Sequence, residues 1–263
     1  MAGFGGYAAF APMLAARLQG VPGILHEQNA VAGTSNRTLA RLARVICLSL
    51  PGTRGFAPEK SVLTGNPVRR AVSEVGRRPR ERRTRRLLVM GGSQGARALN
   101  AFLPEILPAL REAGVEIRHQ SGLKDKDATR AAYAQAGYDP ACVTAFIDDM
   151  AEAYAWADLA LCRSGASTVA ELCAAGLPAV LVPFPHAVHD HQTRNAQVLE
   201  KAGAALLVPE GELRDKDLER VLPQMLADSE GRARMSCAAL DAARPDAAAR
   251  VADVLAEVAA GRA

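Results

Sequence analysis

The sequence lacks the cysteine pairing on which disulfide frameworks and zinc sites depend. Five of its 263 residues are cysteines, and no two of them stand in a Cys-x-x-Cys pair. Most of the five lie within apolar runs. This usage argues against a disulfide-stapled domain or a zinc site and is typical of reduced core thiols in a cytosolic protein.

Long apolar runs and strong charge of one sign are missing as well. No apolar run approaches the roughly 18 residues of a membrane-spanning helix. The first 20 residues have no basic leading region and are interrupted by Gly5, Gly6 and Pro12, so we expect no signal peptide. The net charge of +4 fits an anionic ligand or an acidic membrane surface. It is too weak to argue for nucleic acid, and we expect no nucleic-acid partner.

Two common nucleotide motifs do not occur. The pattern GxxxxGK[ST] of phosphate-binding loops is absent, and so is GxGxxG with a downstream acidic residue. The second absence argues against a nucleotide-dependent oxidoreductase. No internal repeat is present either.

What is present from Leu87 onward is an alternation of short apolar runs with helical stretches. The runs are LLVM, VEIRH, CVTAF, LALCR, AVLVP and AALLV. Continuous apolar strands spaced by helices predict a parallel sheet that is covered on both faces. The final stretch ARPDAAARVADVLAEVAAG has Ala and Val at helical spacing and needs a surface on which to pack.

The first 70 residues predict a smaller unit of the same kind. GILHE and RVICLS are two of its short strands, and Gly3, Gly5 and Gly6 form a turn that opens a helix near Pro12. In a doubly wound fold such a turn follows a strand, and the sequence shows none before it. So short a segment makes a poor independent core. We therefore expect that the chain lacks its natural N-terminus or that another chain supplies the missing strands.

The chain divides into four segments by these patterns. Residues 75–86 contain seven arginines and predict a solvated linker, with a lipid-headgroup or nucleic-acid contact as the alternative. The expected segments are a partial N-terminal domain (1–74), this linker (75–86), a C-terminal nucleotide-binding domain (87–243) and a terminal helix that returns to the first domain (244–263).

Two strand-to-helix turns carry the strongest signals for a nucleotide. MGGSQGARALN, residues 90–100, follows a strand, and its glycines allow close approach of the backbone to a pyrophosphate at the start of the next helix. LCRSGASTVAELCAAGLP, residues 161–178, repeats this arrangement, and Glu171 can accept both hydroxyls of a ribose. The alternatives are a plain turn for the first motif and, for the second, a capping box between Thr168 and Glu171.

Polar residues follow three further strands. PFPHAVHDHQTRNA, residues 183–196, carries three histidines whose spacing differs from that of a helical zinc pair, so we expect no metal. Gln192 and Asn195 in the same segment suit sugar hydroxyls. HEQNAVAG (26–33) and TGNPVRR (64–70) lie where ligands bind in open sheets, and a satisfied polar loop is the alternative for the first. Arg37, Arg41 and Arg44 have the spacing of one face of a helix after HEQN.

The ordered set of motifs GGY, HEQN, TGNPVR, GGSQGA, HQSG, FIDDM, RSGASTVAE and DHQ resembles the MurG family of bacterial peptidoglycan glycosyltransferases over residues 3–255. The resemblance implies an α/β fold of the GT-B type, with two Rossmann-like domains of parallel sheets, the first of them incomplete here. It implies transfer of N-acetylglucosamine, with inversion, from UDP-GlcNAc to lipid I (undecaprenyl-pyrophosphoryl-MurNAc-pentapeptide), which gives lipid II in cell-wall synthesis.

The same resemblance implies a set of substrate-binding residues. Ser93 would lie in the phosphate-binding turn, and Ile147 would meet uracil through its backbone. Gln192 would reach the sugar, and Asn29 and Arg69 would contact the donor from the first domain. The phosphates and the ribose would be lined by Ala166, Ser167, Thr168, Val169, Ala170 and Glu171, with Glu171 on the ribose hydroxyls.

The resemblance also limits what is expected. The family's first glycine-rich loop, with its histidine near the acceptor, has no counterpart in this chain, and no general base is identified. Helix N-termini and arginine would stabilise the leaving pyrophosphate, so no cofactor is expected. The expected location is the cytoplasmic face of the inner membrane, with peripheral attachment to anionic lipid. The alternative functions are a donor-binding subunit, or an inactive fragment that needs a second chain.

Overall fold

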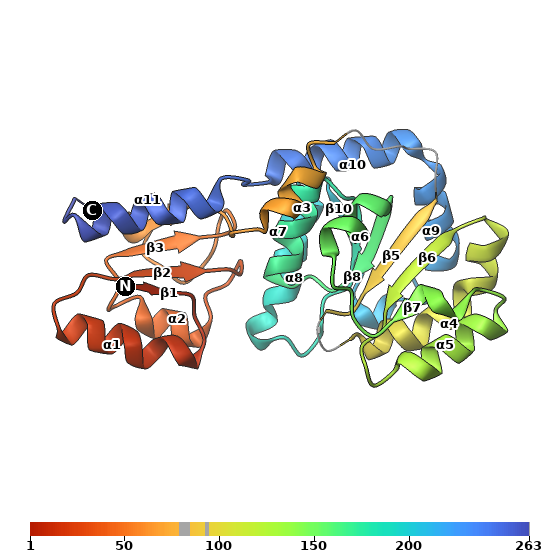
Figure 1. Ribbon diagram of the computed structural model, residues 1–263, viewed down its shortest axis with the longest axis horizontal. Coiled ribbons are helices and arrows are strands. Elements are labelled where there is room, and N and C mark those ends of the chain that lie inside the picture. Colours follow the sequence, from red (N-terminus) through yellow and green to blue (C-terminus); the bar gives the residue numbers. More distant parts are fainter. Residues whose placement is uncertain (79–84, 93–94, 263) are drawn as a thin grey trace.

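The protein contains two parallel β-sheets, each with helices on both faces (Figure 1). The computed structural model describes residues 1–78, 85–92 and 95–262. The expected α/β architecture is therefore confirmed, with a smaller sheet near the N-terminus and a larger one after the Arg-rich stretch. Within that stretch, residues 79–84 lie outside the described residues.

The first sheet has four parallel strands in the order β1-β2-β3-β4. Its strands are β1 (Ala2–Gly3), β2 (Ile24–Glu27), β3 (Val45–Leu48) and β4 (Ser61–Leu63). We expected no strand before the glycine turn. This expectation was wrong, because Ala2 and Gly3 form a strand that pairs with Ile24 and Leu25 of β2. Two residues are too few to display a periodic pattern, so only pairing with β2 identifies this strand.

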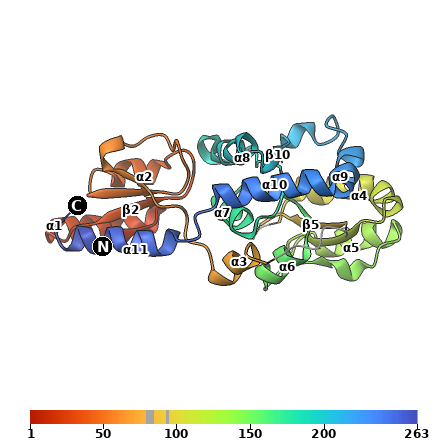
Figure 2. The ribbon, with the colours of Figure 1, turned by 90° about the horizontal axis from the view of Figure 1, so that it is seen from above.

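Helices cover both faces of this first sheet. On one face lie α1 (Phe10–Leu18) and α2 (Thr34–Leu39), where Met13, Leu25 and Leu39 form a small core. On the other face lies α11 (Ala247–Ala259), the last helix of the chain. Its Val251 and Val258 pack on Ile24 of β2 and Cys47 of β3. In Figures 1 and 2, α11 (blue) runs along the first sheet, whereas α10, which precedes it in the chain, lies on the second unit.

The helix after HEQN is shorter than the arginine spacing indicated. α2 ends at Leu39, so Arg37 lies in the helix, whereas Arg41 and Arg44 lie in the turns that follow it. The expectation of one helical basic face was therefore wrong. Leu39 is fully buried, and the chain must turn soon after it to enter β3. All three arginines remain exposed.

The second sheet has six parallel strands in the order β10-β9-β8-β5-β6-β7. All six strands expected from apolar runs are present. They are β5 (Arg86–Met90), β6 (Glu116–Gln120), β7 (Val143–Thr144), β8 (Leu159–Cys162), β9 (Ala179–Leu181) and β10 (Ala205–Leu207). The chain runs outward from β5 to β7 on one side and then from β8 to β10 on the other. The strand order therefore reverses between β5 and β8.

Alternate residues of these strands feed two separate cores, as the pleat of a strand requires. Leu87 and Val89 of β5 face α4 (Arg97–Glu112) and α9 (Leu218–Ala227). Leu88 and Met90 face the opposite side. The helices of that side are α3 (Arg70–Val75), α6 (Met150–Trp156), α7 (Ala166–Ala175), α8 (His191–Lys201) and α10 (Ser229–Ala242). The remaining helix, α5 (Lys126–Gln135), packs beside α4.

The helix α3 belongs spatially to the second sheet, although it precedes the Arg-rich stretch in sequence. Its Val72 and Val75 are buried in the core that α6 and α7 cover. The chain thus crosses between the two units after β4 and crosses back between α10 and α11 (Figure 2). The two crossings touch, because a Cβ added to Gly65 would lie 2.3 Å from Cβ of Arg244.

Candidate functional site

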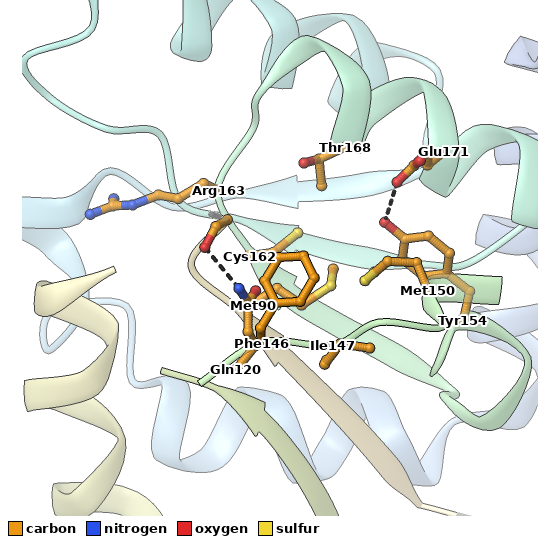
Figure 3. Close-up of a pocket in the computed structure, with 11 residues that line it drawn as sticks. Met90, Gln120, Phe146, Ile147, Met150, Tyr154, Cys162, Arg163, Thr168 and Glu171 are labelled. Atoms are coloured by element: carbon orange, nitrogen blue, oxygen red, sulfur yellow. Dashed lines mark hydrogen bonds between the residues drawn. The ribbon is translucent and has the colours of Figure 1, made fainter. Parts of the chain in front are cut away.

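A cavity opens at the carboxyl ends of β5 and β8, where the strand order reverses. Such a switch point is the usual ligand position in open α/β sheets, because the loops that leave the two strands diverge there. The cavity has a volume of 130 Å³. Figure 3 shows side chains from β5, β6, β8, α6 and α7 around it. Its lining residues are Met90, Gly92, Gln120, Phe146, Ile147, Met150, Tyr154, Cys162, Arg163, Thr168 and Glu171.

Three residues implied by the family resemblance meet in this cavity. Ile147 comes from the loop before α6, whereas Thr168 and Glu171 come from the first turns of α7. Phe146 and Met150 add an apolar wall beside Ile147. The cavity thus has an apolar side that suits a flat base and a carboxylate on the opposite side.

The carboxylate of Glu171 does not cap its own helix. α7 begins at Ala166 with Gly165 as its N-cap, and no side chain caps that end. Thr168 is therefore inside the helix, and the capping-box alternative for Thr168 and Glu171 was wrong. Instead, Oε2 of Glu171 accepts a hydrogen bond from the Tyr154 hydroxyl at 3.0 Å. Oε1 lies 3.2 Å from Nη2 of Arg69, which reaches it from the first domain.

The glycine turn after β5 lies next to this cavity. Gly92 has a φ of 79°, and a Cβ on Gly95 would lie 2.4 Å from the carbonyl oxygen of Ser121. Both positions therefore require glycine. The Gly92 carbonyl accepts a hydrogen bond from Gln120 Nε2 at 2.9 Å, which is drawn in Figure 3. Ser93, the expected phosphate-binding residue of this turn, lies outside the described residues.

A second and larger cavity of 720 Å³ continues from the same switch point. Gln192 lines it, together with Thr168, Arg163 and the glycine turn. Oε1 of Gln192 accepts a hydrogen bond from the backbone N–H of Phe184 at 3.0 Å. Since Thr168 lines both cavities, a ligand that fills the first has room to extend toward Gln192 in the second.

The other residues of the 166–171 stretch do not line either of these two cavities. Ala166, Val169 and Ala170 line a separate small cavity near the crossing between the domains. Val169 is fully buried in the core, and Ser167 is exposed. A helix presents its side chains in all directions, so this stretch can meet one ligand only through part of its side chains and through the N–H groups of its first turn.

In the first domain, the HEQN loop is organised by a buried glutamate. Glu27 is 1% exposed. Its Oε1 accepts from the backbone and side-chain nitrogens of Asn29, and its Oε2 accepts from Gly33 N and Asn36 Nδ2. For Glu27, the alternative of a polar loop whose hydrogen bonds are satisfied within the loop is therefore correct. Asn29 keeps its Oδ1 for a contact with the second domain.

That contact is made by Asn195 of α8, which was expected to suit sugar hydroxyls. This expectation was wrong, because Asn195 is fully buried between the domains. Its Nδ2 donates to Asn29 Oδ1 and to the Ser164 carbonyl, both at 3.1 Å. Its Oδ1 accepts from Ala30 N at 2.9 Å. Asn195 therefore joins the HEQN loop to the turn before α7.

The buried His26 next to this loop is held in one tautomer. Its Nε2 lies 3.0 Å from the Gly65 carbonyl, and its Nδ1 lies 3.2 Å from Gln28 Nε2. Because a carbonyl only accepts and an amide nitrogen only donates, the proton is on Nε2. Burial lowers the pKa of His26, which is partly offset by the hydrogen bond to Gly65 and the charge of Glu27. His26 thus stays neutral and ties β2 to the first crossing.

The three histidines of residues 183–196 point to different partners. His186 contacts the ring of Phe184, with centroids 5.5 Å apart. His189 Nε2 lies 3.0 Å from Thr34 Oγ1 of the first domain, and His191 Nδ1 donates to the Val188 carbonyl at 2.7 Å. Across residues 1–78, 85–92 and 95–262, no group of three His, Cys, Asp or Glu side chains is arranged to hold a metal ion.

Sequence patterns missed two side chains of the site. Tyr154 is 1% exposed and contacts the Glu171 carboxylate, yet its spacing within AEAYAWAD is that of any core residue. Arg163 directly follows β8; its Nη1 donates to the carbonyls of Val182 and Pro183, and its Nη2 pairs with Glu210. A basic residue directly after a buried strand was the available signal for Arg163. No sequence signal identified Tyr154, because its role depends on how α6 packs on α7.

Comparison with known proteins agrees with this geometry. Residues 86–251 match the model of the glycosyltransferase family 28 C-terminal domain, and residues 1–47 match that of the family 28 N-terminal domain. The chain is 53% identical over 260 residues to a UDP-N-acetylglucosamine–N-acetylmuramyl-(pentapeptide) pyrophosphoryl-undecaprenol N-acetylglucosamine transferase of Nitratidesulfovibrio vulgaris, strain DP4. That match covers 97% of this chain and 71% of the relative.

Solved structures give the same result. The crystal structure of Acinetobacter baumannii MurG superposes with a TM-score of 0.72 and 41% identity, over 97% of this chain and 72% of that one. A UDP-N-acetylglucosamine 2-epimerase with 13% identity and a TM-score of 0.65, over 98% of this chain and 71% of that one, shares the fold alone. On the family models and the identity over nearly its whole length, this chain belongs to glycosyltransferase family 28 and, within it, to the MurG transferases.

Proposed function

We propose that this chain transfers N-acetylglucosamine from UDP-N-acetylglucosamine to lipid I and so makes lipid II for peptidoglycan. The observation that carries the proposal is the 53% identity, over 260 residues, to a transferase of that name. The site is consistent with it, because a cavity with an apolar wall and a carboxylate opens at the switch point and continues into a larger one.

The proposed donor position follows the lining of the two cavities. Uracil packs beside Ile147, and the ribose hydroxyls donate to Glu171. The diphosphate lies between the glycine turn, which includes Ser93, and the N-terminus of α7, whose first N–H groups have no side-chain cap. The sugar extends toward Gln192 in the larger cavity. Asn29 and Arg69 approach from the first domain.

The proposed chemistry is a direct displacement. An acceptor hydroxyl attacks the anomeric carbon of the donor sugar and loses its proton to a base, while the bond from that carbon to the UDP oxygen breaks. The configuration inverts, and UDP leaves with the electron pair. The negative charge that develops on the diphosphate is stabilised by the N–H groups of α7 and by Arg69.

We also propose that the first domain meets anionic lipid at the cytoplasmic face of the inner membrane, since lipid I is anchored there. Support comes from α1, which exposes Phe10, Leu14 and Leu18, with Tyr7 94% exposed just before it. Within the described part of the chain, no helix has both the length and the apolar character to cross a bilayer. The proposed attachment is therefore peripheral.

The decisive experiment incubates the chain with UDP-N-acetylglucosamine and a soluble lipid I analogue. We expect UDP release that depends on the acceptor and a disaccharide product detectable by mass spectrometry. Release of UDP without acceptor, or an epimerised donor, would contradict the proposal. If calorimetry shows UDP binding while no product forms, the chain is a donor-binding unit that needs a second chain.

A further inference from the structure

The hydroxyl of Tyr154 lies against the carboxylate on which the proposed ribose recognition depends. Tyr154 projects from α6, is 1% exposed and donates to Glu171 Oε2 at 3.0 Å. Figure 3 shows this bond at the edge of the cavity, with both side chains among its lining residues. A buried tyrosine hydroxyl needs a hydrogen-bond partner, and this carboxylate supplies it.

The two partners of Glu171 differ in how firmly they are held. Arg69 has a side chain that is 58% exposed, so its ion pair contributes little and is readily exchanged for another anion. Tyr154 is fixed by the core around α6 and α7, and a tyrosine has only two side-chain torsions. The bond to Tyr154 is therefore the contact that holds the carboxylate in one orientation.

The orientation of this carboxylate matters for a ribose. A carboxylate offers about four lone-pair sites on two oxygens. Tyr154 uses one site on Oε2 and Arg69 uses one on Oε1, so each oxygen keeps a further lone-pair site. Neighbouring hydroxyls of a ribose can then each donate to one oxygen, provided that the carboxylate plane does not rotate. Without the Tyr154 hydroxyl, the Glu171 carboxylate is held only by its exposed partner Arg69 and is free to rotate.

We propose that Tyr154 is a positioning residue of the donor site, which holds the Glu171 carboxylate in the plane that accepts the two ribose hydroxyls. This inference rests on the proposed function, and within it on Glu171 as the ribose acceptor. Burial raises the pKa of Tyr154 well above its usual value, and the charge of Glu171 raises it further. The phenol therefore stays protonated near neutral pH and remains a hydrogen-bond donor.

The test compares UDP with 2′,3′-dideoxy-UDP on the full chain by calorimetry. The variant is Tyr154→Phe, which removes only the hydroxyl. The matched control is Tyr133→Phe, because Tyr133 is also fully buried, bonds to His119 and lies outside the cavity. Melting temperatures of both variants report any general loss of stability.

We expect Tyr154→Phe to weaken UDP binding about 10-fold, as loss of one hydrogen bond to a charged group does. Binding of dideoxy-UDP should change less than about 2-fold, because that ligand has no hydroxyls for Glu171 to accept. KM for the sugar nucleotide should rise by the same factor as the UDP dissociation constant, with kcat nearly unchanged. The Tyr133→Phe variant should bind both ligands like the wild type.

Each of the other outcomes contradicts either the inference about Tyr154 or the proposed function. An equal loss for both ligands, or no loss, would show that Tyr154 has a structural role only. If the wild type binds UDP and dideoxy-UDP equally well, Glu171 does not read the ribose, and the inference fails while transfer itself can still be measured. If the folded wild type binds no UDP, the proposed function fails and the inference with it.

Discussion

Asn195 of α8 donates a hydrogen bond to Asn29 of the HEQN loop, with 3.1 Å between Nδ2 and Oδ1. The same side chain accepts from Ala30 N and donates to the Ser164 carbonyl. One buried amide therefore satisfies backbone groups on both sides of the domain boundary. Removal of such a group lowers the stability of the fold, because its buried partners then have neither a protein group nor water to bond to.

We expect Asn195→Ala to lower the free energy of unfolding by about 1–3 kcal/mol, because at least one buried backbone group loses its partner. Urea unfolding followed by circular dichroism measures this. The control is Gln197→Ala on the same helix, whose side-chain oxygen accepts from the exposed Arg194. That change should stay within about 0.5 kcal/mol. Equal midpoints for the two variants would contradict the bridging role of Asn195.

Glu171→Gln should separate ribose recognition from stability. The amide oxygen still accepts from Tyr154, so the fold keeps its buried hydrogen bond, whereas the charge that strengthens the bonds to ribose is lost. We expect UDP affinity to fall about 10-fold or more, with little change in melting temperature. Glu152→Gln serves as the control, because Glu152 pairs with Arg118 outside the cavity. A lower melting temperature with unchanged UDP affinity would refute the ribose assignment.

His119 makes stability depend on pH below neutrality. It is 1% exposed, contacts Tyr133 and Asn100, and burial lowers its pKa from 6.5 to about 4. Between these values the unfolded chain binds a proton that the folded chain does not. The free energy of unfolding is therefore not reduced by His119 above pH 6.5. Below that pH, protonation of this group in the unfolded chain lowers the free energy of unfolding, by about 3 kcal/mol at pH 4.

The measurement for His119 is the free energy of unfolding from pH 7.5 to pH 4, compared with His119→Gln. Glutamine can donate and accept in place of the two ring nitrogens but does not titrate. We expect the variant to lose about 3 kcal/mol less than the wild type over this range. Parallel pH curves for the two proteins would show that His119 does not titrate as described.

The membrane proposal predicts that charge on the first domain controls binding to anionic vesicles. Arg37, Arg41 and Arg44 are exposed, and each contributes about 1 kcal/mol near an anionic surface. We expect the triple Arg→Glu variant to sediment less with anionic liposomes than the wild type does. Neutral liposomes should retain little of either protein.

A matched control places the same change of charge on the second domain. Arg111, Arg220 and Arg234 are exposed and lie on α4, α9 and α10. Their triple Arg→Glu variant should sediment with anionic liposomes like the wild type. If both triple variants lose binding equally, net charge is responsible, and a specific role of the first domain is refuted.

Most strands of the second sheet could be predicted because they are short apolar runs between helical stretches, as a doubly covered parallel sheet demands. β6, which contains Glu116 and Arg118, is the exception in composition. The end of α2 could not be predicted. Arg41 and Arg44 have a helical spacing, but the helix ends at Leu39 because the chain turns there to enter β3. β1 was missed because two residues carry no period. Local pattern thus identifies elements, while their ends depend on what they pack against.

The candidate site could also be predicted only in part from the sequence. Glu171 could be placed at a nucleotide site because it follows the end of a strand, where ligands bind in open sheets. Ile147 and Thr168 were placed with it by the family resemblance, and all three line the same cavity. The partner of Glu171 could not be predicted, since Tyr154 reaches it only through the packing of α6 on α7. Asn195 was assigned to the sugar for lack of any sign that a second domain buries it.

The contact between Gly65 and Arg244 has a mechanical consequence. Both segments that connect the domains pass through this point, so the domains share a single pivot instead of two separated tethers. Hinges of domain motion are formed by a few residues of this kind, which lie between elements. Gly65 has a φ of 87°, and any side chain there would push the two connections apart. Arg69, which follows this crossing in the chain and reaches Glu171, therefore depends for its position on a glycine that lines neither cavity.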